Sequence, residues 1–229
     1  MNDHPHDHDH DHPHGHGHNH PHDPIEVPDG AGHYELMVHA IKELLIEKGV
    51  ISADDIRKTL EFMDTRTPAL GAKVVAKAWS DPAFKKRLME DGTKAVAELG
   101  IPMGDAELIV VENTKDTHNV VVCTLCSCYP RTVLGLPPDW YKSRNYRSRV
   151  VVEPRAVLKE FGTSMPDDVT VRVHDSNADM RYMVLPMRPA GTAGWDETRL
   201  ASTVTRDCLI GVAVPTLPKI PQNPKPRKS

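Results

Sequence analysis

The sequence predicts an α+β protein, in which an N-terminal helical arm precedes a layered α-β-β-α domain with its helices outside the sheets. Two observations predict this class. Apolar residues recur at helical spacing between Leu36 and Leu99, and β-branched runs bracketed by turn residues begin at Leu108. With 229 residues, of which 39% are hydrophobic, the chain can bury one sizeable core and carry an appended arm.

Residues 1–24 are expected to form a disordered, histidine-rich tail. Histidine occupies every second position from His4 to His22, and Asp, Gly, Pro and Asn stand between them. Apart from Met1 and the prolines, Ile25 is the first apolar residue of the chain. Imidazoles and carboxylates at this density bind divalent cobalt, nickel or zinc weakly and in many registers. The tail is therefore either a low-complexity extension or a segment that gathers metal for a site elsewhere.

Residues 25–68 are expected to form the helical arm. Apolar residues follow helical spacing over residues 36–45, and this pattern ends at Gly49. Ser52 then caps a second helix, and Asp55 three residues later completes a variant of the capping box. Because the arm has apolar side chains but little core of its own, we expect it to dock on a partner chain.

Residues 69–214 are expected to form the α+β domain, and residues 215–229 a loose tail rich in proline and lysine. Asp81 and Pro82 form a typical N-cap and first-turn pair. The sequence predicts helices at residues 71–79, 82–89, 93–99, 154–161 and 197–204, and strands at residues 108–112, 119–122, 169–173, 182–187 and 209–214.

Three of the four cysteines fall within the six residues 123–128, on a loop directly after the strand expected at 119–122. Their sulfurs are close enough to meet on one metal ion. If Cys126 and Cys128 bind the same ion, the peptide between them is drawn against it, so the amides of Ser127 and Cys128 become candidate ligands. An amide nitrogen binds strongly only after it loses its proton, which requires a strongly polarising ion such as a trivalent transition metal.

Other interpretations of the cysteine cluster fit less well. A structural zinc site collects four Cys or His ligands in two separated pairs, and no second close pair exists outside the tail. A redox disulfide between Cys123 and Cys126 agrees with the spacing, but the third cysteine and the lack of a βαβ pattern argue against it. A chance cluster of buried thiols remains the alternative without a metal.

Composition excludes several classes of function. The chain has no run of about eighteen apolar residues to span a membrane and no secretory signal, so a cytoplasmic location is the default expectation. Few cysteines, mostly clustered, disfavour a secreted disulfide scaffold. The net charge is −4, and the basic cluster at residues 142–149 is more typical of a solvated or subunit-facing surface than of a nucleic-acid site.

Residues 120–130 resemble the metal-binding signature of the nitrile hydratase α subunit. Residues 71–79, 134–142, 181–186 and 188–192 also resemble segments of that family, so the likeness extends from about residue 34 to residue 215. Thr124 and Tyr129 are the residues typical of its cobalt branch. The resemblance implies a hydro-lyase that converts a nitrile to an amide. It also implies one low-spin trivalent cobalt ion, bound by the sulfurs of Cys123, Cys126 and Cys128 and by the amide nitrogens of Ser127 and Cys128.

The resemblance further implies that Cys126 is oxidised to sulfinate and Cys128 to sulfenate. Sulfenate is normally transient, so a metal bond and charged hydrogen-bond partners must stabilise these states. Cys128, with Ser127 beside it, is the candidate catalytic residue, acting as the nucleophile or as the base that orients water. In relatives the charged partners are arginines of a β subunit. The family therefore implies an αβ or α2β2 assembly, with a cobalt activator protein for maturation.

Asp175, Asp179 and Arg181 have two interpretations. In relatives an acidic residue and an arginine at these places belong to the polar shell of the site, whereas the alternative is a surface ion pair. Thr124, Tyr129 and Arg131 complete the expected shell and substrate pocket. His174 is expected to pack rather than to bind metal, and Cys208 to be an inert core thiol.

Two departures from the family pattern bear on the substrate. Met103 and its neighbours stand where relatives commonly carry a glutamine, so that contact is in doubt. Arg131 replaces a tryptophan of many nitrile hydratases and would favour a small anion. There, and at residues 205–215, the chain resembles the γ subunit of thiocyanate hydrolase, which is the alternative enzyme. A cobalt-storage protein or metallochaperone, supported by the histidine tail, is the alternative outside enzymes.

Overall fold

The computed structural model describes residues 32–125 and 128–218, and the chain divides into two compact units between Val50 and Ile51. The histidine tail, Cys126, Ser127 and the last eleven residues lie outside the described residues. In the described part of the chain, no helix combines the length and the apolar character needed to cross a membrane.

Helix α1 (His33–Glu47) is the described element of the first unit. It follows the predicted pattern and ends just before Gly49, which has a φ of +66°. None of its residues is buried, and its apolar side chains, Leu36 and Ile41 among them, are exposed.

Helix α2 (Ala53–Asp64) begins the second unit with the predicted capping box. The Asp55 amide donates to the Ser52 hydroxyl at 3.0 Å, and the Ser52 amide donates to the Asp55 carboxylate at 3.0 Å. This reciprocal pair satisfies two backbone donors that a helix N-terminus leaves unpaired. Helix α2 also buries none of its residues.

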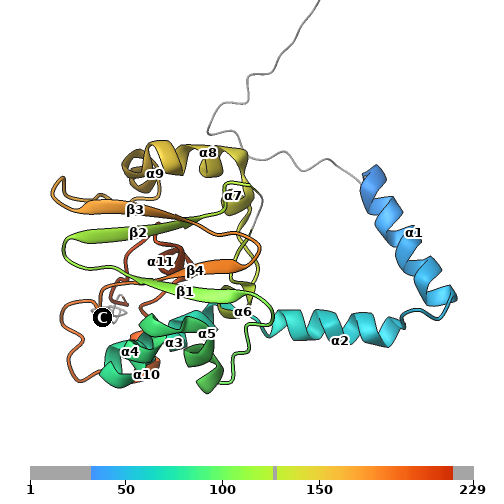
Figure 1. The fold of residues 1–229 in the computed structure, drawn as a ribbon, viewed down its shortest axis with the longest axis horizontal. Helices are drawn as coiled ribbons and strands as arrows, with labels where there is room; N and C mark the ends of the chain where they lie inside the picture. Colours follow the sequence, from blue (N-terminus) through green and yellow to red (C-terminus); the bar gives the residue numbers. More distant parts are fainter. Residues whose placement is uncertain (1–31, 126–127, 219–229) are drawn as a thin grey trace, which may run out of the picture. The chain divides into compact units, whose positions relative to one another are not determined.

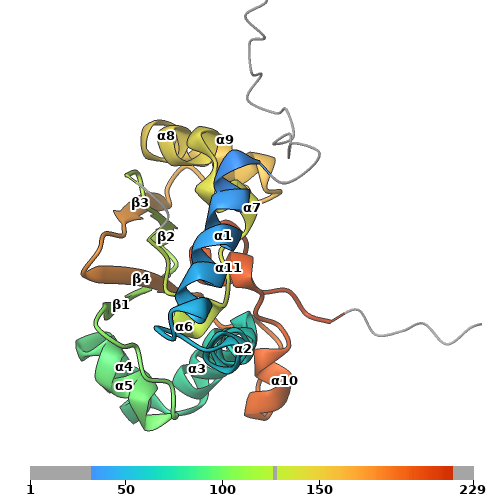
Figure 2. The same ribbon diagram turned by 90° about the vertical axis from the view of Figure 1, so that its right-hand side faces the viewer.

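Two groups of helices enclose the strands, as Figures 1 and 2 show. The first group contains α3 (Pro68–Ser80), α4 (Pro82–Glu90) and α5 (Gly92–Glu98), and α10 (Glu197–Ala201) packs against α3. The second group contains α7 (Asp139–Lys142), α8 (Arg144–Val152) and α9 (Pro154–Glu160). Asp81 caps α4 as predicted, because its carboxylate accepts from the amides of Ala83 and Phe84, each at 3.0 Å.

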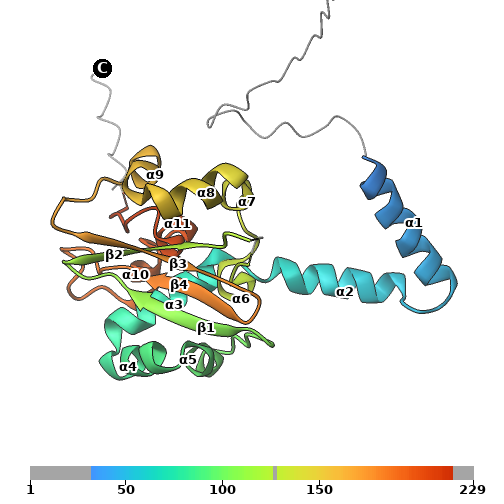
Figure 3. The same ribbon diagram turned by 45° about the horizontal axis from the view of Figure 1, so that its top comes forward.

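The strands between these helices form two parallel pairs in the described part of the chain. β1 (Glu107–Glu112) pairs with β4 (Met180–Leu185), and β2 (Thr117–Val122) pairs with β3 (Thr170–Asp175). Helices α4 and α5 lie beside β1, as Figure 3 shows. The predicted α+β class is therefore confirmed, and four of the five expected strands form within two residues of their predicted limits.

The strand predicted for residues 209–214 is wrong, because helix α11 (Arg206–Ile210) occupies the start of this segment. Thr205 caps the helix, and Gly211 ends it with a φ of +92°. Leu209 and Ile210 are both buried, so the apolar run reflects burial on all sides and not a strand. A short apolar run of this kind cannot be assigned to a strand or a helix from its periodicity alone.

A buried polar network joins α11 to the strands. The His118 Nε2–H group donates to the carbonyl of Gly211 at 2.7 Å, and the side-chain amide of Asn113 lies 3.2 Å from His118 Nδ1. Asn113 Oδ1 in turn accepts from the amide of Asn119 at 2.7 Å. His174 packs against the ring of Tyr182 with centroids 5.2 Å apart, in line with its predicted packing role.

Candidate metal centre

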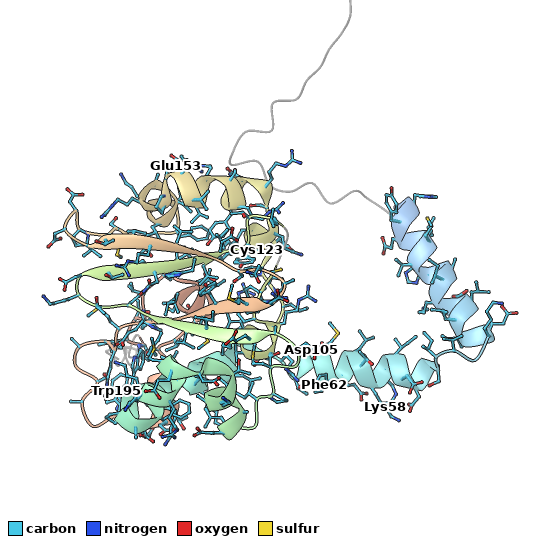
Figure 4. The ribbon with its side chains drawn as sticks, viewed as in Figure 1. Lys58, Phe62, Asp105, Cys123, Glu153 and Trp195 are labelled. Carbon is cyan, nitrogen blue, oxygen red and sulfur yellow. The ribbon has the colours of Figure 1, made fainter. Side chains whose placement is uncertain are left out.

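The cysteine loop begins where β2 ends, and Figure 4 labels Cys123 at this point. Cys123 is buried. The backbone just before it is held by the pairing of β2 with β3, and the amide of Ser176, directly after β3, donates to the carbonyl of Val122 at 2.7 Å. The position of the first cysteine is therefore fixed by the paired strand that precedes it.

Asp175 anchors the next residue of the loop. Its carboxylate accepts from the Thr124 amide at 2.9 Å and from the Thr124 hydroxyl at 2.5 Å. The pairing of β2 with β3 explains this contact, because Val122 lies opposite Asp175 and directs the loop past the carboxylate. Arg147 adds a third contact, since its guanidinium donates to the Thr124 carbonyl at 3.4 Å. The structure thus brings together two residues of the predicted shell, Thr124 and Asp175.

Tyr141 contacts the far end of the loop, where its hydroxyl donates to the carbonyl of Cys128 at 3.0 Å. Tyr129 packs edge-on against Tyr141, with ring centroids 5.0 Å apart. Burial raises the pKa of both phenols well above the ordinary value of tyrosine, so both remain protonated. Tyr141 is a site residue that the sequence does not predict. The available signal was its place in residues 134–142, one of the segments that resemble the family.

A cavity of about 380 Å³ opens beside the loop. It is lined by Met103, Ala106, Cys128, Tyr129, Pro130, Arg131, Thr132 and Arg181. No carboxylate of the described residues lines it. Two buried donor atoms, the Tyr129 hydroxyl and Arg181 Nη1, have no hydrogen-bond partner among those residues. The charged side chains in its described lining are both cationic, those of Arg131 and Arg181.

The remaining predicted residues occupy different positions. Arg131 begins helix α6 (Arg131–Leu134), is exposed, and pairs with no carboxylate of the described residues. Asp179 is exposed, and its backbone carbonyl accepts from the amide of Glu107 at 2.7 Å. No ion pair within the described ranges joins Arg181 to Asp175 or Asp179, so their interpretation as a surface ion pair finds no support.

The described ends of the loop suit a thiolate-bound metal. Cys123 is buried and Cys128 is half-buried at the cavity, Thr124 donates hydrogen bonds to Asp175, and the Cys128 carbonyl accepts one from Tyr141. Soft thiolate donors select transition metals over magnesium or calcium. Among residues 32–125 and 128–218, no group of three His, Cys, Asp or Glu side chains is placed to bind a metal ion.

Cys208, the remaining cysteine, lies in α11. It is buried, and its sulfur lies 3.2 Å from the Thr205 hydroxyl. Burial raises the pKa of this thiol, which keeps it protonated and poorly nucleophilic.

Comparison with known proteins identifies the family. Residues 32–213 match the family described as nitrile hydratase, alpha chain. The chain belongs to this family. It is 54% identical over 183 residues to the low-molecular weight cobalt-containing nitrile hydratase subunit alpha of Rhodococcus rhodochrous. The matched region covers 79% of this chain and 88% of the relative.

Thiocyanate hydrolase is also similar to this member of the nitrile hydratase α-chain family. The γ subunit from Thiobacillus thioparus is 47% identical over 204 residues, covering 84% of each chain. A solved thiocyanate hydrolase variant, in which an arginine is replaced by tryptophan, superimposes with a TM-score of 0.77 at 46% identity. That match covers 87% of this chain and 96% of the solved chain. The fold is thus shared by enzymes that are named for different substrates.

Proposed function

We propose that this chain is the α subunit of a cobalt-dependent nitrile hydratase, which adds water to a nitrile and produces the corresponding amide. Family membership and the cobalt-containing relative from Rhodococcus rhodochrous support the proposal. The structural observation that carries it is the cysteine loop, held at both ends, with Cys123 buried behind it and Cys128 facing the cavity.

In this proposal the metal ligands are the sulfurs of Cys123, Cys126 and Cys128 and the amide nitrogens of Ser127 and Cys128. When bound, a trivalent cobalt ion would supply Lewis acidity toward the nitrile nitrogen or toward water. The anchors on Thr124 and Cys128 reduce the reorganisation that the loop needs in order to present these donors.

Cys128 is the proposed reactive residue, because it lines the cavity that a substrate would enter. As a sulfenate, its oxygen either accepts a proton from the water that attacks the nitrile carbon or attacks that carbon itself. Cys126 is proposed to be a sulfinate. Arg181 lines the same cavity and can donate to an oxidised sulfur or to substrate.

The α chains of this family work with a β subunit. We propose that further charged donors to the oxidised cysteines come from this β subunit, in an αβ or α2β2 assembly. An activator protein that delivers cobalt and a cytoplasmic location also belong to the proposal.

The test is to produce the chain with its β subunit and to measure metal, modification and turnover together. We expect close to one cobalt per α chain that resists chelator, and added oxygen confined to the peptide containing Cys126 and Cys128. Deleting residues 1–23 controls for metal bound by the histidine tail. Stoichiometric zinc that a chelator removes would refute the proposal. Metal release without any turnover would instead indicate a storage protein or metallochaperone.

Thiocyanate hydrolysis is the second candidate, because Arg131 and Arg181 both line a cavity that lacks carboxylates in its described wall. A guanidinium stays charged at any working pH and attracts a small anion more than a neutral nitrile. The assembled complex should be assayed with acrylonitrile and with thiocyanate, before and after Arg131→Trp. Nitrile hydration as the main activity supports the first candidate. Efficient thiocyanate hydrolysis that Arg131→Trp abolishes, with negligible nitrile hydration beforehand, supports the second.

A further inference from the structure

We infer that Tyr141 is a positioning residue for the reactive end of the cysteine loop, acting through its hydrogen bond to the carbonyl of Cys128. The inference rests on the proposed function, because it assigns Tyr141 a role toward the bound metal. Tyr141 is fully buried, and its hydroxyl donates to Cys128 O at 3.0 Å. It does not line the cavity, so it acts through Cys128 and not on the substrate.

The surroundings of Tyr141 hold its ring in one place. Trp140, Tyr146 and Tyr129 all pack against it, with centroids 6.0, 5.8 and 5.0 Å away. The side chain of Ser176, directly after β3, interacts with the same phenol. A donor fixed in this way cannot follow the loop if the loop moves, and therefore restrains the position of the Cys128 carbonyl.

The position of that carbonyl matters because the carbonyl, the amide nitrogen and the side chain of Cys128 share one Cα atom. Fixing the carbonyl limits rotation about both backbone bonds of this residue, and thus limits the direction in which its sulfur points. At the other end, Asp175 fixes Thr124. Only residues 125–127 separate the two anchored residues, so Tyr141 and Asp175 together set the span that the loop must bridge.

Tyr146 provides a matched control. It belongs to the same aromatic cluster, is also buried, and donates a hydrogen bond of similar length, 2.8 Å, to the carbonyl of Val121. Val121 lies within β2, where the pairing with β3 already fixes the backbone. Removing either hydroxyl deletes one buried hydrogen bond, but only the Tyr141 hydroxyl contacts the cysteine loop.

The experiment compares Tyr141→Phe with Tyr146→Phe in the cobalt-loaded complex with the β subunit. Three quantities are measured: the visible sulfur-to-cobalt absorption, the oxygen added at Cys126 and Cys128, and kcat and KM separately. For Tyr141→Phe we expect a shifted absorption band, incomplete oxidation, and kcat lowered by about tenfold with KM nearly unchanged. For Tyr146→Phe we expect the band of the unsubstituted complex.

An unchanged band and kcat in Tyr141→Phe, or equal losses in both variants, would overturn the inference. If Tyr141→Phe does not assemble, Ser176→Ala decides: a smaller shift of the band in the same direction supports the inference, and an unchanged band overturns it. Absence of cobalt absorption in the unsubstituted complex would refute the proposed function itself, and this outcome is distinguishable because it precedes any substitution.

Discussion

Replacing Asp175 should loosen the start of the cysteine loop without unfolding the domain. Its carboxylate accepts two hydrogen bonds from Thr124, at 2.9 and 2.5 Å. A hydrogen bond contributes about 1 kcal/mol net, and because Asp175 is exposed, solvent screens its charge and the charge adds little to this value. Asp175→Ala, which removes both bonds, should therefore lower the free energy of unfolding by about 2 kcal/mol, and Asp175→Asn by about 1 kcal/mol.

A double-mutant cycle tests whether this loss comes from the contact with Thr124. Thr124→Val keeps the shape of the side chain but removes its hydroxyl. Urea unfolding of Asp175→Asn, Thr124→Val and the double variant should give a coupling free energy of about 1 kcal/mol. Asp179→Asn is the control, because this exposed carboxylate makes no ion pair or hydrogen bond with a described residue, and it should change stability by less than about 0.5 kcal/mol. Additive losses, with coupling below about 0.3 kcal/mol, would refute the reasoning.

Three further predictions concern α11 and the buried network. Gly211→Ala should lower the free energy of unfolding, measured in urea, by more than about 3 kcal/mol. Gly211 has a φ of +92°, and a Cβ there would lie 2.0 Å from the carbonyl oxygen of Asn119. A loss below about 1 kcal/mol would contradict this packing. Burial lowers the pKa of His118 below 6.5, so its contribution to stability should be complete above pH 6.5 and be lost as the pH falls toward its folded-state pKa. Urea midpoints measured between about pH 5 and 8 should show this slope, and His118→Gln should reduce it. Cys208 should react with a thiol reagent at about pH 8 only after denaturation, and labelling of the folded chain at this residue would show that it is accessible.

Elements that depend on local chemistry were predictable from the sequence. The caps at Ser52 and Asp81 form as expected, since each involves residues two or three positions apart. Helix α8 was missed although Ser143 caps it by accepting from the amide of Tyr146 at 3.1 Å. Its several arginines were interpreted as a charged surface, and they obscured the apolar face formed by Tyr146 and Val150.

The site was predictable only in part. The cysteine cluster is visible as a local motif, and its position directly after a strand followed from the β-branched run before it. The contact between Thr124 and Asp175 spans 51 residues and depends on the parallel pairing of β2 with β3, which no local pattern specifies. Asp175 was therefore identified from the family resemblance and not from its chemistry. The role of Tyr141 could not be predicted, because it depends on the contact between α7 and the loop, which no local pattern specifies.

The residues that hold the loop and those that line the cavity belong to different elements. Asp175 and Tyr141, on β3 and α7, contact the cysteine loop. Arg131 and Arg181, on α6 and β4, line the cavity beside it. Substitutions in the cavity wall can therefore change the charge offered to a substrate without altering the anchors of the loop. Relatives named for nitriles and for thiocyanate are 54% and 47% identical to this chain, and a change in cavity charge with the anchors kept is one way in which such proteins can differ. The separation also predicts that Arg131→Trp lowers the positive charge of the cavity while the cobalt content of the purified complex stays unchanged.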